Sequence, residues 1–384
     1  MIPDFGNEHF LAQMKQLKPK GTFNSYLVSL TAMMHGYDVI FYKSQKEASS
    51  KISTFPATFP DPVFFDVKSG NNTVKFASSR TEFEEPKASQ LTLNKSYLKA
   101  YLAKAGINVP FGGGASVKDL AILDKMKRAG VDLVSVKPVA GKGSRGVRLN
   151  KTLEQAETIV KDNPDDVFII EQMIVGAEFR VTASKTDVVA AQMIIPPHVI
   201  GDGKSTLNDL ITQETEARKR NPVFAVRPLD PRQIIHMVSV QKAHGSNVLD
   251  KGKVFRLTAD GLPNVAFRVP VLDRLPQQIK DIATQTVQLI RGSVCGLDIF
   301  ADRAGIPYVL DIDATSGMWF ESFPHPKGDW NLDVPEYILR KNFPRHRSEP
   351  RQILSYDYAA LKDELLREDR QTKGVNAADF VEFA

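Results

Sequence analysis

The sequence predicts a mixed α/β fold of the α+β type, in which a small α/β domain precedes a larger unit of sheets covered by helices. With 384 residues, the chain is long enough for two or three domains of about 100–200 residues each. Its 42% hydrophobic and 25% charged residues are ordinary for a globular protein. Strand-like and helix-like segments alternate along most of the chain, which is typical of layered structures. We expect four regions, with these bounds: 1–90, 91–175, 176–345 and 346–384.

The first region, 1–90, is predicted to be the small α/β domain. A helix is expected from Phe23 to His35, because Gly36 supplies the usual glycine stop. Strands are expected at 38–42, 63–67 and 73–76, and the last two flank a turn at 69–72.

The second region, 91–175, alternates helices and strands. Helices are expected at 92–105 and 116–128, the second with Ser116 as its N-cap. Thr152, with Gln155 three residues later, predicts a capping box at the start of another helix. Strands are expected at 131–137, 145–149 and 167–171.

The third region, 176–345, begins with two strands, 178–184 and 188–195, that pair around a turn. Helices are expected at 206–218 and 276–290, and further strands at 296–301 and 308–313. The tail, 346–384, is expected to contain one charged helix near 358–370 and receives no functional assignment.

Charge and cysteine content restrict the class of protein. The 50 basic and 45 acidic residues give a net charge of +5, a mild surplus that suits an anionic ligand but does not imply nucleic acid. The single cysteine, Cys295, excludes a disulfide within the chain, indicates a reducing compartment and is expected to be inert core. No apolar run approaches the ~20 residues of a membrane span, and the first residues lack a signal-peptide pattern. A cytoplasmic location is therefore expected.

A glycine-rich segment, 141–146, formally matches the G-x-G-x-x-G motif of dinucleotide-binding proteins. That motif must open a helix, whereas the residues that follow Gly146 are strand-like. A glycine loop between two strands is a hairpin that can close over phosphates with its backbone N–H groups. A plain flexible hairpin fits the pattern equally well.

A second motif, Gly203-Lys204-Ser205-Thr206, is similar to the end of a P-loop. A P-loop needs a glycine five positions before Gly203, and that residue is His198. We interpret the segment instead as a helix start capped by Ser205 or Thr206.

Three acids stand in the interior of two apolar strands near the end of the third region: Asp298, Asp311 and Asp313. Asp311 and Asp313 are two residues apart and point to one face of a strand. If the hairpin is centred between Ala304 and Gly305, Asp298 lies directly opposite Asp311. Three converging carboxylates repel one another unless a cation is present, and hard oxygen ligands select Mg²⁺ or Mn²⁺. The pattern predicts a metal site.

Two other interpretations of these acids stay open. They could cap turns or pair with lysine and arginine side chains. If Ile299 rather than Asp298 shares a face with Asp311, the cluster falls apart.

Several of these segments occur in an order that belongs to a known family. In chain order they are Asn94-Lys95; Gly106-Ile107-Asn108-Val109-Pro110; Val136-Lys137-Pro138 with the glycine segment; Ile169-Ile170-Glu171-Gln172; Gly176-Ala177-Glu178-Phe179-Arg180; and the three aspartates. Together they resemble the ATP-grasp superfamily over about 91–344. The segment 196–206 is especially similar to the ligase modules of cyanophycin synthetase and of the bifunctional glutathione-synthesising enzymes, and D-Ala–D-Ala ligases share the wider pattern. The resemblance implies an ATP-grasp fold with a small N-terminal pre-ATP-grasp domain.

The resemblance also implies roles for individual residues. Lys95 and Lys137 would neutralise ATP phosphates. Glu171 would accept from the adenine amino group, and Glu178 would bind the ribose. Arg180 would reach a phosphate or the substrate carboxylate, and Arg256, with Arg268 as a rival, would stabilise the transferring phosphoryl group. The full nucleotide set adds Gly141, Gly143, Ser144, Gly146, Gln172, Met173 and Ile174, and the metal ligands are Asp298, Asp311 and Asp313.

The sequence departs from the family pattern at positions 311, 313 and 194, and it lacks the glycine pair expected after Arg256. The family usually has Glu at position 311 and Asn at 313, and this chain has Asp at both. Where relatives carry an arginine near the second substrate, this chain has Ile194. These changes leave the chemistry in place and put the substrate in doubt.

The function implied is an ATP-dependent carboxylate–amine ligase that releases ADP and phosphate through an acyl phosphate, with ATP and Mg²⁺ (or Mn²⁺) as cofactors. Its partners would be small-molecule or peptide carboxylates and amines, and a homodimer is possible. Two alternatives are an ATP-grasp kinase that stops at phosphoryl transfer, and a non-catalytic nucleotide-binding protein.

Overall fold

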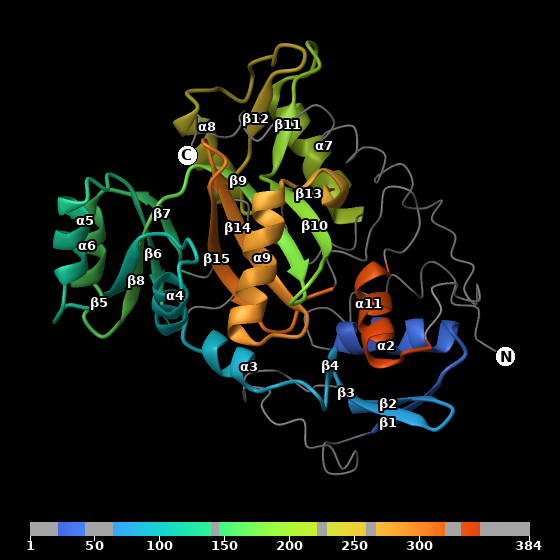
Figure 1. The fold of residues 1–384 in the computed structure, drawn as a ribbon. Coiled ribbons are helices and arrows are strands. Elements are labelled where there is room, and N and C mark those ends of the chain that lie inside the picture. Colours follow the sequence, from blue (N-terminus) through green and yellow to red (C-terminus); the bar gives the residue numbers. More distant parts are fainter. Residues whose placement is uncertain are drawn as a thin grey trace.

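The computed structural model describes residues 22–42, 64–139, 146–220, 229–258, 266–318 and 332–345. These residues form four sheets with helices packed on them (Figure 1). The predicted α/β fold class is confirmed. The helix expected at 358–370 lies outside the described residues. The predicted domain bounds stay predictions, and the one between 90 and 91 falls inside a helix at Lys87–Thr92.

The first sheet is antiparallel and carries two helices. Its strands, in spatial order, are β1 (Asp38–Tyr42), β2 (Phe64–Ser69), β3 (Asn72–Ala77) and β4 (Arg80–Thr81). Helix α2 (Thr22–Met34) is followed by Gly36 at φ +78°, the left-handed conformation expected of a glycine stop. Helix α11 (Asp333–Asn342), which the sequence did not predict, packs against α2 (Figure 1).

The second sheet has two helices, α5 (Ala121–Arg128) and α6 (Leu153–Lys161), packed together on it (Figure 1). Its strands, in spatial order, are β5 (Gly112–Ala115), β8 (Phe168–Gln172), β6 (Val134–Pro138) and β7 (Arg148–Lys151). The predicted capping box is present, since Thr152 and Gln155 each accept from the other's backbone N–H.

The third sheet forms the centre of the molecule (Figure 1). Its strands, in spatial order, are β13 (Phe267–Pro270), β10 (Val188–Ile195), β9 (Gly176–Ala183), β14 (Cys295–Asp302) and β15 (Pro307–Asp313). Helix α9 (Gln277–Ile290) buries one face of itself against this sheet, together with α3 (Lys87–Thr92) and α4 (Lys95–Lys104). Cys295 is fully buried here, and burial raises the pKa of its thiol to about 12, which agrees with the inert core cysteine predicted from the sequence.

A fourth, two-stranded sheet pairs β11 (His198–Ile200) with β12 (Val254–Arg256). Helices α7 (Leu207–Arg220) and α8 (Pro231–Val240) lie beside it and share one apolar cluster with it. A short 3-10 helix, η1 (Leu272–Arg274), follows β13. None of the helices in the described ranges is long and apolar enough to cross a membrane.

Two predicted helices were wrong at their N-termini. The helix expected at 92–105 is two helices, because Asn94 is extended and its side chain accepts from the Tyr97 N–H, which starts α4 anew. The helix expected from Ser116 begins at Ala121. Ser116 and Asp119 instead exchange two backbone hydrogen bonds in a turn, and the Asp119 carboxylate accepts from the Ala121 N–H.

Candidate active site

The hairpin of β14 and β15 carries the three aspartates. Asp298 pairs directly with Asp311, as the sequence predicted, and Asp313 lies opposite Gly296. Nearer the turn the register shifts, so that Ile299 pairs with Val309 and Leu310 is the extra residue of a β-bulge. The predicted hairpin centre is therefore right for the aspartates and half a residue off at the turn.

Arg180, from the neighbouring strand β9, joins two of these aspartates. Its Nη1 donates to Asp298 Oδ1 at 2.9 Å and its Nη2 donates to Asp313 Oδ2 at 2.5 Å. Burial disfavours the charged guanidinium, but the two carboxylates outweigh burial and raise the pKa of Arg180 well above its usual value. Burial, opposed by Arg180, raises the pKa of Asp298. Gly296 makes room for this arrangement, since a Cβ there would lie 2.3 Å from Arg180 Nη2.

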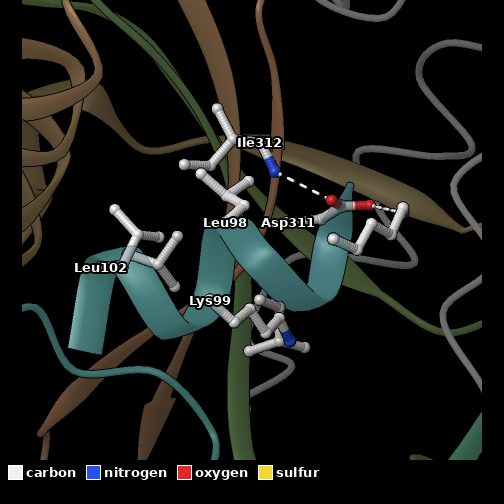
Figure 2. Close-up of a pocket in the computed structure, with 8 residues that line it drawn as sticks. Leu98, Lys99, Leu102, Asp311 and Ile312 are labelled. Atoms are coloured by element: carbon white, nitrogen blue, oxygen red, sulfur yellow. Dashed lines mark hydrogen bonds and ion pairs between the residues drawn. The ribbon is translucent and has the colours of Figure 1, made fainter. Parts of the chain in front are cut away.

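The third aspartate, Asp311, accepts a hydrogen bond from Lys95 at the start of α4. Asp311 also accepts from the Ile312 N–H at 3.0 Å. Burial lowers the pKa of Lys95, and Asp311 more than offsets it, so the pKa of the lysine rises. Figure 2 shows this contact at a small pocket between α4 and β15, which Leu98 and Lys99 also line.

Each of the three aspartates forms an ion pair with a cationic side chain. Among the described residues, no group of three His, Cys, Asp or Glu side chains is arranged to hold a metal ion. Arg180 and Lys95 supply the positive charge that the cluster requires. The structure agrees with the interpretation that these acids pair with lysine and arginine. Metal binding by them stays a prediction.

Glu171, on β8, lies at the centre of a second ionic cluster. Its side chain is 3% exposed and accepts from two lysines, with Lys137 Nζ at 2.6 Å from one oxygen and Lys99 at the other. Burial alone would raise the pKa of Glu171, but Lys99 and Lys137 hold it below its usual value. The structure therefore brings together Glu171 and Lys137, two residues that the family resemblance assigned to the nucleotide.

Lys99 was missed by the sequence analysis. It lies four residues after Lys95 on α4, so the two lysines occupy one face of the helix one turn apart. That spacing was the available signal, since the helix expected at 92–105 already contained both lysines. Burial is the largest cause that lowers the pKa of Lys99, to about 8.

The remaining predicted nucleotide residues are distributed around these clusters. Gly141, Gly143 and Ser144 lie outside the described residues, whereas Gly146 is at φ +77° beside Pro138. Glu178 lies two residues before Arg180 on β9 and hence on the same face. The main-chain N–H groups of two others are engaged: Gln172 donates to Phe111 and Met173 to Leu133, while Ile174 is partly buried.

Arg256 lies apart from the aspartates. It is buried on β12, opposite His198, in the two-stranded sheet rather than in the sheet that carries the hairpin. Its rival Arg268 is on β13, opposite Ile194 and at the edge of the central sheet.

The segment that is similar to a P-loop is a helix start, as predicted. Asp202 accepts from the backbone N–H groups of Lys204 and Ser205 and from the Ser205 hydroxyl. These hydrogen bonds lower the pKa of Asp202 to about 2. Thr206 caps α7, because its hydroxyl accepts from the Asp209 N–H at 3.2 Å.

The chain is similar in sequence to two kinds of curated protein. A scan against models of protein families finds no match. The glutathione biosynthesis bifunctional protein of Listeria innocua is 26% identical over 251 residues, which cover 60% of this chain and 32% of that protein. The cyanophycin synthetase of Geminocystis herdmanii is 27% identical over 282 residues, which cover 69% of this chain and 32% of that protein. The chain thus spans about a third of the length of the curated relatives it matches.

A solved structure supports the fold. The bifunctional glutathione synthetase from Pasteurella multocida superposes with a TM-score of 0.56 at 15% identity, covering 84% of this chain and 44% of that one. At this level of identity the likeness concerns the fold. The chain therefore has the ATP-grasp fold, and the resemblance to ATP-grasp carboxylate–amine ligases that its motifs predicted is confirmed.

Proposed function

We propose that the protein is an ATP-dependent carboxylate–amine ligase. The observation that carries the proposal is the position of α4, which contacts a carboxylate of the second sheet through Lys99 and one of the central sheet through Lys95. Lysine cations and carboxylates thereby face one another across two sheets. A site for a polyanion with a metal ion requires both, because the cations attract the polyanion and the carboxylates attract the metal ion. The relatives named above support the same chemistry.

The side chains of the site have distinct proposed roles. Lys95, Lys137 and the glycine segment would bind the phosphates of ATP, and Glu171 and Glu178 would bind its adenine and ribose. Arg180 would bind a phosphate or the substrate carboxylate. Arg256 would act only if the two-stranded sheet reaches the phosphates.

The donor set of the hairpin fits a hard divalent cation. Asp298, Asp311 and Asp313 offer carboxylate oxygens of the kind Mg²⁺ or Mn²⁺ prefers. They would hold the ion once Lys95 and Arg180 turned to the anionic ligand. Bound there, it would offset negative charge on the transferring phosphoryl group.

The proposed reaction has two steps, the formation of an acyl phosphate and its conversion to an amide. An oxygen of the substrate carboxylate attacks the γ-phosphorus, the bond to the β-phosphate oxygen breaks, and ADP leaves an acyl phosphate. An amine then attacks the acyl carbon, the C–O bond to phosphate breaks, and the nitrogen loses a proton to give an amide. Lys137 and Arg180 offset the charge that develops on phosphate oxygens.

Hydroxylamine trapping tests the proposal. Amino acids and short peptides would be screened with ATP and Mg²⁺, with hydroxylamine in place of the amine. The expected products are a hydroxamate and ADP in equal amounts, both absent from Asp311→Ala. Formation of AMP and pyrophosphate would refute the proposal. ADP with a stable phosphorylated product, indifferent to any amine, would assign the protein to the kinases.

The proposed partners are small-molecule or peptide carboxylates and amines. A cytoplasmic location is proposed from the single, buried cysteine, which suits a reducing compartment. A homodimer stays a prediction.

A further inference from the structure

Helix α4 presents two lysines that bind carboxylates on opposite sides of the candidate site. Lys95 pairs with Asp311 on β15, and Lys99, one turn later, pairs with Glu171 on β8. The first pair is the more open, with side chains 44% and 34% exposed, whereas the second is more buried, with 14% and 3%. The two lysines therefore sit in different environments although they share one helix face.

Each carboxylate oxygen of Glu171 accepts a hydrogen bond from a different lysine. Lys99 donates to Oε1 and Lys137 donates to Oε2. One buried negative charge thus faces two positive charges, and the excess positive charge is costly unless an anion joins the cluster. An anion such as a phosphate would bind the lysine that can leave Glu171 most readily.

Lys137 is that lysine. Its side chain is 26% exposed, about twice the 14% of Lys99. It also lies at the end of β6, next to the residues that lead into the glycine segment. Lys99, in contrast, approaches Glu171 from a helix whose apolar residues Leu98 and Leu102 are packed in the core.

We propose that Lys99 is a positioning residue that keeps Glu171 neutralised while Lys137 moves to the phosphates of the nucleotide. Without Lys99, the release of Lys137 would leave a buried carboxylate with no counter-charge, which is strongly unfavourable. Nucleotide affinity would then fall although Lys99 touches no phosphate. The inference rests on the proposed function, since it requires an adenine nucleotide at this site.

A double-mutant cycle on Mg-ADP affinity tests this role. Calorimetric titrations would compare the wild-type protein, Lys99→Met, Glu171→Gln and the double variant. The amide introduced by Glu171→Gln retains an oxygen acceptor for an adenine amino group but carries no charge. We expect Lys99→Met to weaken binding on the order of tenfold when Glu171 is present, and by less than about threefold in the Glu171→Gln background. Equal losses in both backgrounds would mean that Lys99 contacts the phosphate directly, and would overturn the inference. No loss in either would also overturn it.

Three controls keep the result interpretable. Lys104→Met removes an exposed lysine from the same helix and should leave the affinity for Mg-ADP unchanged. Lys99→Arg keeps the positive charge and should bind within about threefold of wild type; a folded Lys99→Arg protein as weak as Lys99→Met would contradict the inference. If the wild-type protein bound no Mg-ADP, the proposed function itself would fail, which is a different outcome from either pattern above.

Discussion

Lys99 illustrates what happens when two partly buried cations share one carboxylate. Burial and the neighbouring Lys137 lower its pKa, and Glu171 only partly restores it, so the pKa is about 8. Lys95, one turn away, faces three aspartates and has a raised pKa instead. The same residue type on the same helix face is thus driven in opposite directions by the number of carboxylates it faces.

The lowered pKa of Lys99 predicts a dependence of stability on pH. Above pH about 8 the folded protein releases this proton, whereas the unfolded chain retains it until about 10.5. The unfolded state then binds more protons, so the free energy of unfolding should rise with pH across this window. In urea unfolding, the free energy of unfolding of the wild type minus that of Lys99→Met should rise by up to about 1.4 kcal/mol per pH unit. A difference that stays constant from pH 7 to 10 would contradict this. Lys104→Met, which retains Lys99, should gain stability with pH as the wild type does.

The residue pairings at the site were only partly predictable from sequence. The Asp298–Asp311 pair follows from strand alternation and a turn at Gly305, which are local features. The pairing of Arg180 with Asp298 and of Lys95 with Asp311 joins segments more than a hundred residues apart. The family resemblance marked these cations as ligand-binding. No local pattern predicts which carboxylates they pair with.

At the scale of elements, the contact between β9 and β14 depends on a close backbone approach. Gly176, the first residue of β9, pairs with Asp302. A Cβ at Gly176 would lie 1.8 Å from the Ala301 carbonyl oxygen and 2.8 Å from the Asp302 Cα. Because both atoms belong to the backbone, no side-chain rotation can relieve the clash.

Gly176→Ala should therefore lower the free energy of unfolding by about 3 kcal/mol, since the two strands must separate locally. Gly114→Ala is the matched control, because Gly114 is also in a strand but has no atom within 4 Å of its Cβ position. That control should change stability by less than about 0.5 kcal/mol. Chemical denaturation of both variants measures the difference, and equal effects would disprove the backbone-contact argument.

Elements with strong local signals were predicted well, and short ones were not. The capping box at Thr152 and the glycine stop at Gly36 each fix a helix end by local hydrogen bonding or conformation. Strands β5, β11, β12 and β13 have only three or four residues. That length is too short for an alternation of apolar and polar residues to be recognised in the sequence. Strand β5 is Gly-Gly-Gly-Ala, a composition that strands avoid, and it forms because it pairs with β8.

At the scale of the whole molecule, the first sheet shares its core with the central sheet. Phe65 of β2 belongs to the same apolar cluster as Ile195 of β10, Phe267 of β13 and Ile338 of α11. The first sheet is thereby packed against the sheet that carries Arg180. A sequence divided into successive regions could not show a cluster assembled from both ends of the described chain.

Stabilisation of the protein by its ligand should distinguish the glycine segment that follows Lys137 from the Gly203-Lys204 motif. A ligand at 100 times its Kd adds about 2.7 kcal/mol to the stability of the folded state. Lys137→Ala should lose most of the rise in Tm that Mg-ATP produces, because Lys137 is proposed to bind the phosphates of the nucleotide. Lys204→Ala should retain it, since Lys204 is exposed in a turn that caps α7. A greater loss in Lys204→Ala would restore the P-loop interpretation.

The pairing of α2 with α11 has a consequence for the protein during its synthesis. His35 Nε2 lies 2.6 Å from Glu336 Oε1, across 301 positions of the chain, and Leu27 and Val28 share a core with Ile338 and Leu339. Ribosomes add roughly 5–20 residues per second, so α2 waits about 15–60 s for its partner. During that interval its apolar side is incompletely covered and offers a binding site to chaperones. The nascent chain therefore carries exposed apolar surface at α2, the first of the described helices, until the C-terminal part of the described chain has been made.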